Sequence, residues 1–327
     1  MWTLMVTLGR VHRVVWAAVV SAGLILESGC APKAAPPPVR VEARPWPQGG
    51  PDGVELITDH FHLRLTARDP ALRAVLPAFL EAAHGEYARI IPPTGPDPRR
   101  LPVYLFETRQ EWVRFTRRFA PAQADTYLHI QAGGYTDQRT GIAAAFDISR
   151  DRTLSLLAHE GFHQYAALHL PEPLPAWLNE GLACQFEAFR LEGDRPAFTP
   201  RRNLLRLEAL REALTLEEGF IPPARLLRMD AGQAVRDPGR STRMFYAQLW
   251  STVLYLREPS GPYARGFAAL LADAGTPRLK AAIRARRLAD PTAGSFSDPE
   301  IAFHCYITPD LDGFMAGYRA FAEALAR

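Results

Sequence analysis

The segment 151–170 constrains the fold more than any other part of the chain. It carries His159 and His163 four positions apart, with Glu160 between them. Apolar residues fall on most sides of a helix built from this segment, and such a helix is buried. Positions i and i+4 lie on one helix face, so the two imidazoles can bind one ion. Buried His and Glu side chains need partners, and a metal ion with its water would satisfy all three; the alternative is a pair of hydrogen-bonded core histidines.

Glu180 supplies a third candidate ligand. Residues 175–190 predict a second helix, with Pro175 suited to its first turn. Two histidines and one carboxylate are a ligand set of catalytic zinc, which keeps a fourth position open for water. We therefore expect one zinc ion (Zn2+) per chain, held by His159, His163 and Glu180. The alternative for Glu180 alone is a surface carboxylate.

The pattern His159-Glu160-x-x-His163, followed by the run W-L-N-E-G-L-A at 177–183, resembles the gluzincins, the thermolysin-like and aminopeptidase-N-like zinc metallopeptidases. It is also similar to a metallopeptidase-like domain of exported bacterial proteins of unknown function. The motif covers about 150–190, and a weaker likeness in layout extends over about 120–257. The resemblance implies a zincin-like fold, a zinc ion, Glu160 as general base and a substrate groove bordered by an edge strand.

Two features depart from that family. The spacing from His163 to Glu180 is slightly shorter than in thermolysin. The aspartate that thermolysin carries four residues past its glutamate is Cys184 in this chain. Partners that orient metal ligands matter for affinity, so this position bears on the metal site. Glu187 is a candidate replacement, although on a continuous helix it would lie two turns from Glu180.

Tyr246 is a further candidate site residue. Residues 244–256 predict an amphipathic helix, and Tyr246 lies beside its apolar stripe. Aminopeptidase-N-like enzymes carry a catalytic tyrosine at the start of a helix in a comparable position. The resemblance therefore implies that the hydroxyl of Tyr246 stabilises the oxyanion. The alternative is a core tyrosine with one satisfied hydroxyl.

The pattern as a whole predicts an α+β chain, with a mixed α/β part at 52–150 and a mainly helical part at 151–327. Residues 141–146 are either the edge strand of the groove, because small side chains let a peptide pair alongside them, or a plain core strand. Other β-like runs predict strands at 54–66 and 101–106 and a hairpin within 127–147. Helical patterns cover 71–91, 108–119, 151–170, 175–190, 201–216, 241–257, 262–274 and 311–326.

The start of the chain predicts an export signal followed by a linker. A basic flank and an uncharged apolar run at 14–26 predict an export signal peptide at 1–30, because the run is too short for a membrane span. Small residues before Cys30 resemble a bacterial lipoprotein cleavage box, which would attach a lipid to Cys30. The alternative is ordinary cleavage and a soluble secreted product. Residues 31–51 are proline-rich and predict an extended linker, followed by the working domain at 52–327.

Two cysteines remain once Cys30 is assigned to lipid. In an oxidising compartment, Cys184 and Cys305 can pair as a disulfide. The alternative is two small buried thiols. A role for Cys184 as a direct metal ligand is less favoured, because Glu180 already completes the set.

Composition and motifs narrow the class of protein. The formal net charge is +3, which argues against a dedicated nucleic-acid binder, and the pairs Arg117-Arg118 and Arg201-Arg202 are expected on solvated helix faces. We expect a zinc peptidase outside the cytoplasm, periplasmic or bound to the cell envelope, that acts on a peptide or protein. Glu160 would take a proton from zinc-activated water. The alternative is a catalytically inactive module whose groove binds an envelope peptide or partner protein.

Overall fold

The structure is a computed structural model of the chain, and it describes residues 38–93, 95, 99–130, 133–216, 219–236 and 240–327. The expected signal peptide, the candidate lipid site at Cys30 and the start of the expected linker lie outside the described residues. The chain divides into two units, 1–37 and 38–327, and every described element belongs to the second. Among the described residues, none of the helices combines the length and apolar character that a membrane span requires.

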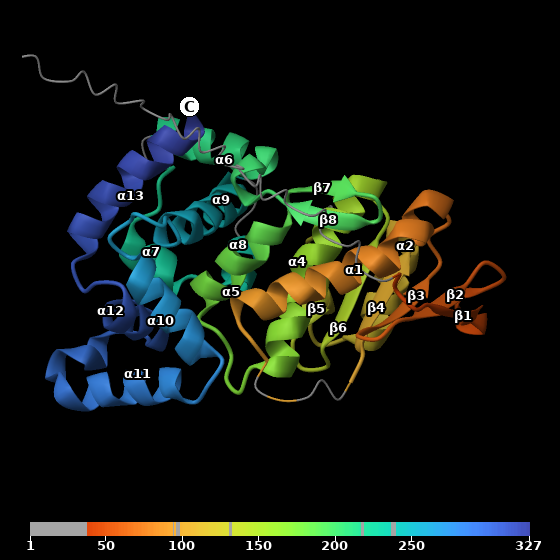
Figure 1. The fold of residues 1–327 in the computed structure, drawn as a ribbon, viewed down its shortest axis with the longest axis horizontal. Coiled ribbons are helices and arrows are strands. Elements are labelled where there is room, and N and C mark those ends of the chain that lie inside the picture. Colours follow the sequence, from red (N-terminus) through yellow and green to blue (C-terminus); the bar gives the residue numbers. More distant parts are fainter. Residues whose placement is uncertain (1–37, 94, 96–98, 131–132, 217–218, 237–239) are drawn as a thin grey trace, which may run out of the picture. The chain divides into compact units, whose positions relative to one another are not determined.

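The described part confirms the predicted α+β class, with the sheet in the N-terminal part and helices in the C-terminal part (Figure 1). The strands are β1 (Glu42–Pro45), β2 (Val54–Ile57), β3 (Phe61–Leu65), β4 (Leu101–Phe106), β5 (Gly134–Asp137), β6 (Ile142–Phe146), β7 (Phe189–Glu192) and β8 (Arg195–Phe198). The helices are α1 (Pro70–Ile90), α2 (Arg109–Phe119), α3 (Ala124–Leu128), α4 (Arg150–His169), α5 (Ala176–Ala183), α6 (Leu204–Thr215), α7 (Pro223–Arg228), α8 (Ala231–Arg236), α9 (Arg240–Leu256), α10 (Ala264–Ala274), α11 (Arg278–Ala289), α12 (Asp298–Tyr306) and α13 (Leu311–Ala326). Short 3-10 turns are η1 (Pro47–Gly49), η2 (Cys184–Phe186), η3 (Pro200–Arg202) and η4 (Pro291–Ser295).

The main sheet has the strand order β1-β2-β3-β4-β6-β5. Strands β3, β4 and β6 run parallel, whereas β5 returns antiparallel to β6 as the hairpin expected within 127–147. The candidate edge strand at 141–146 is β6, and it lies between β4 and β5. The edge-strand interpretation of this segment is therefore wrong, because the preceding arm of the hairpin covers its outer side. The edge of the sheet next to α4, the helix that carries His159 and His163, is β5.

The N-terminal strands differ from prediction in two further places. The single strand expected at 54–66 is the hairpin β2–β3, because the chain turns at Thr58, whose N–H donates to the carbonyl of Phe61. β1 lies within the segment 31–51 that we expected to be a linker, and it pairs with β2. The sheet therefore begins before residue 52.

Helices α1 and α4 cover one face of the sheet, where the large hydrophobic core lies. The hydroxyl of Tyr87 in α1 donates to the carbonyl of Ala158 at 2.7 Å, directly before the histidine pair. A Cβ atom on Gly161 would stand 2.9 Å from that hydroxyl oxygen. Glycine between the two histidines therefore lets α1 and α4 approach closely, and this contact holds α4 against α1.

The helix predicted at 175–190 ends early. α5 stops at Ala183, η2 follows, and β7 begins at Phe189. Phe186 in η2 packs edge-on against Tyr87 at 4.6 Å and Phe198 at 5.1 Å between ring centroids. Burial of this ring favours the tighter turn over a continued α-helix. The residue after it, Glu187, consequently takes a direction that a straight helix would not give.

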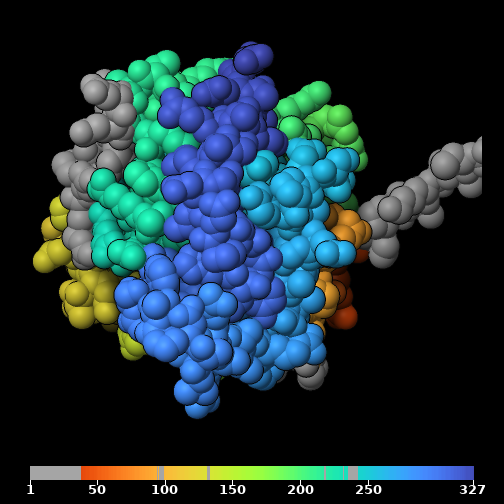
Figure 2. All heavy atoms as spheres, turned by 90° about the vertical axis from the view of Figure 1, so that its left-hand side faces the viewer, coloured from red at the N-terminus to blue at the C-terminus, as the bar shows by residue number. Residues whose placement is uncertain are grey.

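The C-terminal helices pack around α9, which contacts both α5 and α6. A Cβ atom on Gly181 of α5 would lie 2.6 Å from Cγ2 of Val253 in α9. This close approach fixes α5, and with it Glu180, against the helical part of the protein. Figure 2 shows α13 and α11 on the outer surface of this part.

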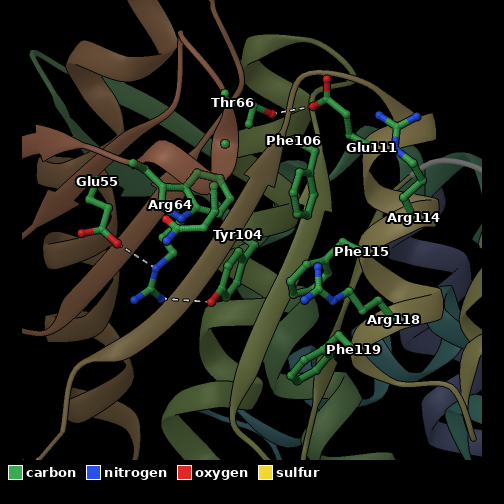
Figure 3. A pocket seen from close by; sticks show the side chains of 14 residues that line it. Glu55, Arg64, Thr66, Tyr104, Phe106, Glu111, Arg114, Phe115, Arg118 and Phe119 are labelled. Carbon is green, nitrogen blue, oxygen red and sulfur yellow. Dashed lines mark hydrogen bonds and ion pairs between the residues drawn. The ribbon is translucent and has the colours of Figure 1, made fainter.

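A second, smaller core lies on the opposite face of the sheet, under α2. Alternate residues of β4 point to the two faces, so Val103 and Leu105 join the large core while Tyr104 and Phe106 face α2. Figure 3 shows these two rings beside Phe115 of α2. The two faces of the sheet are therefore covered by different helices, and α4 with its two histidines lies on only one of them.

Candidate metal site

His159 and His163 lie on the buried side of α4. The two side chains belong to residues that are 7% and 8% exposed, and Glu160 between them is 7% exposed. The Nε2 atoms of the two imidazoles are 3.1 Å apart, as one helical turn permits. α4 therefore presents two ring nitrogens to one common point.

Glu180 approaches the same point from α5. Its Oε2 atom lies 3.4 Å from Nε2 of His159 and 3.3 Å from Nε2 of His163. This oxygen is buried, and the two imidazole nitrogens are its ion-pair partners. Burial would raise the pKa of Glu180, but the charges and hydrogen bonds of His163 and His159 lower it well below its ordinary value. The carboxylate is thus charged, and the structure brings the three expected ligands together.

The three donor atoms fit a zinc ion. Ligands about 2.0–2.2 Å from a tetrahedral zinc lie roughly 3.3–3.6 Å from one another. The separations here are 3.1 to 3.4 Å. Because Nδ1 of His159 faces a carboxylate, Nδ1 keeps the proton when the ring is neutral, and the lone pair of Nε2 then points toward the oxygen of Glu180. Lone pairs that converge in a buried space are stabilised by a cation, and this grouping is one of two described sets that could hold one.

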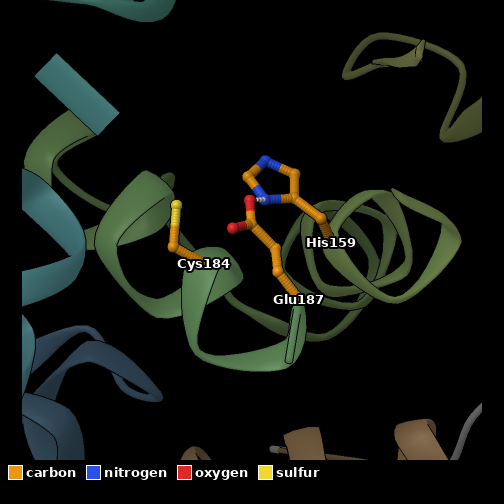
Figure 4. A group of neighbouring side chains, drawn as sticks. All are labelled: His159, Cys184 and Glu187. Atoms are coloured by element: carbon orange, nitrogen blue, oxygen red, sulfur yellow. Dashed lines mark hydrogen bonds and ion pairs between the residues drawn. The ribbon is translucent and has the colours of Figure 1, made fainter. Parts of the chain in front are cut away.

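Glu187 supports His159 from the opposite side. Its Oε1 atom accepts from Nδ1 of His159 at 2.9 Å (Figure 4). This contact orients the ring and assigns the proton to Nδ1, as carboxylates beside metal-binding histidines do. Glu187 was the candidate replacement that a straight helix would have held two turns away. The early end of α5 removes that obstacle, because η2 turns Glu187 back toward α4.

Glu187 is itself held by α6. Arg206 donates from Nε to Oε2 at 2.7 Å and from a terminal nitrogen to Oε1 at 2.5 Å. Asn203 donates to Oε2 at 2.7 Å while its own side-chain oxygen caps the first turn of α6. Burial would raise the pKa of Glu187, but Arg206 and His159 lower it well below its ordinary value. The carboxylate that orients His159 is therefore charged and fixed by three donors.

Cys184 lies beside this pair, in the group with His159 and Glu187 that Figure 4 draws. Burial raises the pKa of its thiol, and the charge of Glu187 adds to this. The thiol is therefore neutral, unlike a metal-bound thiolate. Cys184 and Cys305 are both free in the structure, so the disulfide alternative is not what it shows. Cys184 is a buried thiol as in the other alternative, whereas Cys305 is exposed.

The expected general base, Glu160, lies next to the free edge of the sheet. The hydroxyl of Thr136 in β5 donates to the backbone carbonyl of Glu160 at 3.0 Å. β5 is the last strand of the sheet among the described residues, so no described strand pairs with its outer backbone groups. An edge that could accept another strand therefore runs beside the base.

Tyr246 reaches the site from α9. Its ring lies edge-on to the ring of His159, with 6.2 Å between centroids, and the guanidinium of Arg206 covers it at 5.0 Å. Burial raises the pKa of Tyr246 well above its ordinary value, and the nearby carboxylates of Glu180 and Glu160 raise it further. The phenol therefore keeps its proton and is a hydrogen-bond donor at this site.

Asn203 and Arg206 are the parts of the site that sequence reasoning missed. Both fall at the start of the helix predicted at 201–216 and carry no spacing relation to the histidine pair. The sequence offers only an indirect signal for these two residues. A carboxylate buried at the site needs a charged or polar partner from another element. Nothing in the sequence says which element supplies it.

Comparison of the chain with protein-family models, with curated proteins and with solved structures finds no match in any of the three.

Proposed function

We propose that the protein is a zinc-dependent peptidase. One observation carries this: two imidazole nitrogens and a charged carboxylate oxygen converge within 3.1 to 3.4 Å of one another, in a buried setting. His159, His163 and Glu180 would hold the ion. Three protein ligands leave a position for water, which distinguishes a catalytic zinc from a structural one.

A zinc ion in this set would lower the pKa of a water molecule toward neutrality and polarise a peptide carbonyl. Glu160 follows His159 directly in α4 and is buried with it. Its carboxylate would take the proton of the attacking water and pass it to the leaving amine. Tyr246 would donate its hydroxyl proton as a hydrogen bond to the developing oxyanion, because its phenol stays neutral.

The substrate would bind as an extended strand along β5. Thr136 ties this edge to the backbone of Glu160 at 3.0 Å, so a peptide paired with β5 would pass the base. The groove implied by the sequence is thus bordered by β5 instead of the segment 141–146. The substrate class is a peptide or protein, with no nucleic acid involved.

The alternative, an inactive binding module, rested on the loss of the orienting aspartate at Cys184. Glu187 contacts His159 in the manner expected of that residue, which removes this argument. The intact Glu160 also speaks against it, since a pure binding site has no need of a base.

Export is part of the same proposal. A signal peptide at 1–30 and a lipid on Cys30 would hold the peptidase at the cell envelope or in the periplasm. Labelling with a radioactive fatty acid in cells would test this, with Cys30→Ser as the variant that loses the label.

Digestion of a peptide library by the zinc-loaded full-length protein tests the activity. We expect cleavage by the wild type and a rate about 10²–10⁴-fold lower for Glu160→Gln, which removes the base but keeps the side-chain volume. Glu172→Gln is the matched control, because Glu172 pairs with Lys280 on the exposed surface and should leave the rate unchanged.

Equal cleavage by Glu160→Gln and the wild type would contradict the mechanism. A zinc-loaded wild type that cleaves nothing in the library would favour the binding module.

A further inference from the structure

A cavity of about 990 Å³ opens on the side of the sheet away from α4 (Figure 3). Its walls come from the turn between β1 and β2, from β3 and β4, and from α2. None of the ligands or supporting residues of the metal site lines it. Its volume is at the upper end of the range in which proteins bind small molecules, so it can admit one.

Aromatic rings form one wall of this cavity. Phe115 of α2 lies 4.6 Å from Tyr104 and 5.1 Å from Phe106, between ring centroids. Phe119, one turn further along α2, stacks on Phe115 at 5.2 Å with an interplanar angle of 11°. Phe115 and Phe119 are only partly buried, so they retain surface that another flat group can cover.

The carboxylates that line the cavity are already engaged. Glu55 accepts from Arg44 at 2.6 Å and from Arg64 at 2.9 Å. Glu111 accepts from the hydroxyl of Thr66 at 2.6 Å. These groups are therefore poor partners for an incoming cation.

Two cations that line the cavity have no acid partner in the part of the chain that the structure describes. Arg114 and Arg118 lie one turn apart on α2, both are exposed, and no ion pair to either occurs among the described residues. Figure 3 shows them on α2 beside Phe115 and Phe119. The sequence predicts Arg118 on a solvated helix face. In the structure this residue lines the cavity, beside the aromatic wall.

We propose that this cavity binds an aromatic anion, such as an aromatic carboxylate. Its ring would stack on the wall formed by Tyr104, Phe115 and Phe119, and its negative group would meet Arg114 and Arg118. The two arginines can donate several charge-assisted hydrogen bonds to an oxyanion, and the phenylalanines supply the apolar surface. The site is separate from the metal centre, so the proposal holds whether or not the protein is a peptidase.

Isothermal titration of the full-length protein with naphthalene-2-carboxylate tests the site. We expect saturable binding of this probe, binding at least about tenfold weaker for the uncharged naphthalene-2-carboxamide, and no detectable binding of acetate. This order of affinities would show that binding needs both the aromatic ring and the negative charge of the probe. Equal binding of the carboxylate and the carboxamide, or no binding of the carboxylate at millimolar concentration, would overturn the proposal.

Variants locate the binding. Arg114→Gln combined with Arg118→Gln should weaken naphthalene-2-carboxylate at least about tenfold, because both charges are removed while the ring wall stays. Arg117→Gln is the matched control, since Arg117 is exposed on the same helix but does not line the cavity. An unchanged affinity in the double variant, or an equal loss in the control, would assign the binding elsewhere and contradict the proposal.

Discussion

Nδ1 of His159 and Oε1 of Glu187 lie 2.9 Å apart, so the first histidine of the pair is oriented by a carboxylate from the turn that follows α5. The same carboxylate accepts two hydrogen bonds from Arg206. Helices α4 and α6 are thereby joined through the residue that follows η2. The residue that contacts His159 is thus Glu187, and not the residue four positions past Glu180, which is Cys184.

Glu187→Gln should weaken zinc binding. Glutamine keeps the size of the side chain but loses the charge that holds the proton on Nδ1 of His159, and the loss of such partners costs about 10- to 100-fold in metal affinity. Competition with a chromophoric chelator measures the affinity. Glu192→Gln, at the exposed end of β7, is the control and should bind zinc as the wild type does. An unchanged affinity for Glu187→Gln would show that this contact does not support the site.

The position of Glu187 beside His159 could not be predicted from the sequence, because it depends on where α5 ends. Periodicity predicted a helix at 175–190, and the register of its first part is right, since Glu180 points at the histidine pair. The end of α5 depends on Phe186, whose ring finds aromatic partners in α1 and β8. Such contacts join residues far apart in the chain, so local patterns could not place Glu187.

Gly181→Ala should destabilise the fold and weaken zinc binding together. The added Cβ would meet Cγ2 of Val253 at 2.6 Å and the carbonyl of Leu249 at 2.9 Å, which must push α5 from α9. Overpacking of this kind costs about 1–3 kcal/mol, and α5 carries Glu180. Urea unfolding measures the free energy, and chelator competition measures the affinity.

Gly85→Ala is the matched control for that substitution. Gly85 lies inside α1, and a Cβ there meets nothing within 4 Å. Alanine is favoured over glycine in a helix, so the variant should gain about 0.5–1 kcal/mol and bind zinc normally. If both variants behaved alike, the close contact of α5 with α9 would not be what positions Glu180.

Zinc should stabilise the protein more at pH 8 than at pH 6. Burial would lower the pKa of His159 and of His163. Neighbouring groups, which include Glu180 in both cases, nevertheless raise each pKa above the ordinary 6.5. In the metal-free protein, the protonated imidazoles contribute stability that is fully present below pH 6.5 and is lost as pH rises through the raised pKa values. Zinc requires neutral imidazoles, so it must displace these protons at pH 6. The increase in Tm on zinc addition measures this, and an equal or larger increase at pH 6 would contradict it.

Tyr246→Phe should lower kcat on a cleaved peptide by about 10²-fold, because one donor to the oxyanion is lost. KM and zinc content should change little, since the ring beside His159 remains. A core tyrosine would give a different result, with unfolding at lower urea concentration and no specific loss of kcat.

The sequence predicts the presence of the sheet better than the order of its strands. Strand β4 coincides with the predicted 101–106, because its apolar run is bounded by clear turn signals. The hairpin within 127–147 was also correct, but which of its two arms forms the edge is decided by the pairing of β6 with β4. Helix α11 escaped prediction, because only Leu279 and Ile283 face the core and leave no apolar stripe.

Metal content tests the central claim most directly. The full-length wild type, supplied with zinc and dialysed, should carry about one zinc ion per chain by inductively coupled plasma mass spectrometry. His159→Ala and Glu180→Ala should each lose most of it while their circular dichroism stays that of the folded protein. A folded wild type without zinc, or variants that keep it, would contradict the proposed site and with it the peptidase mechanism.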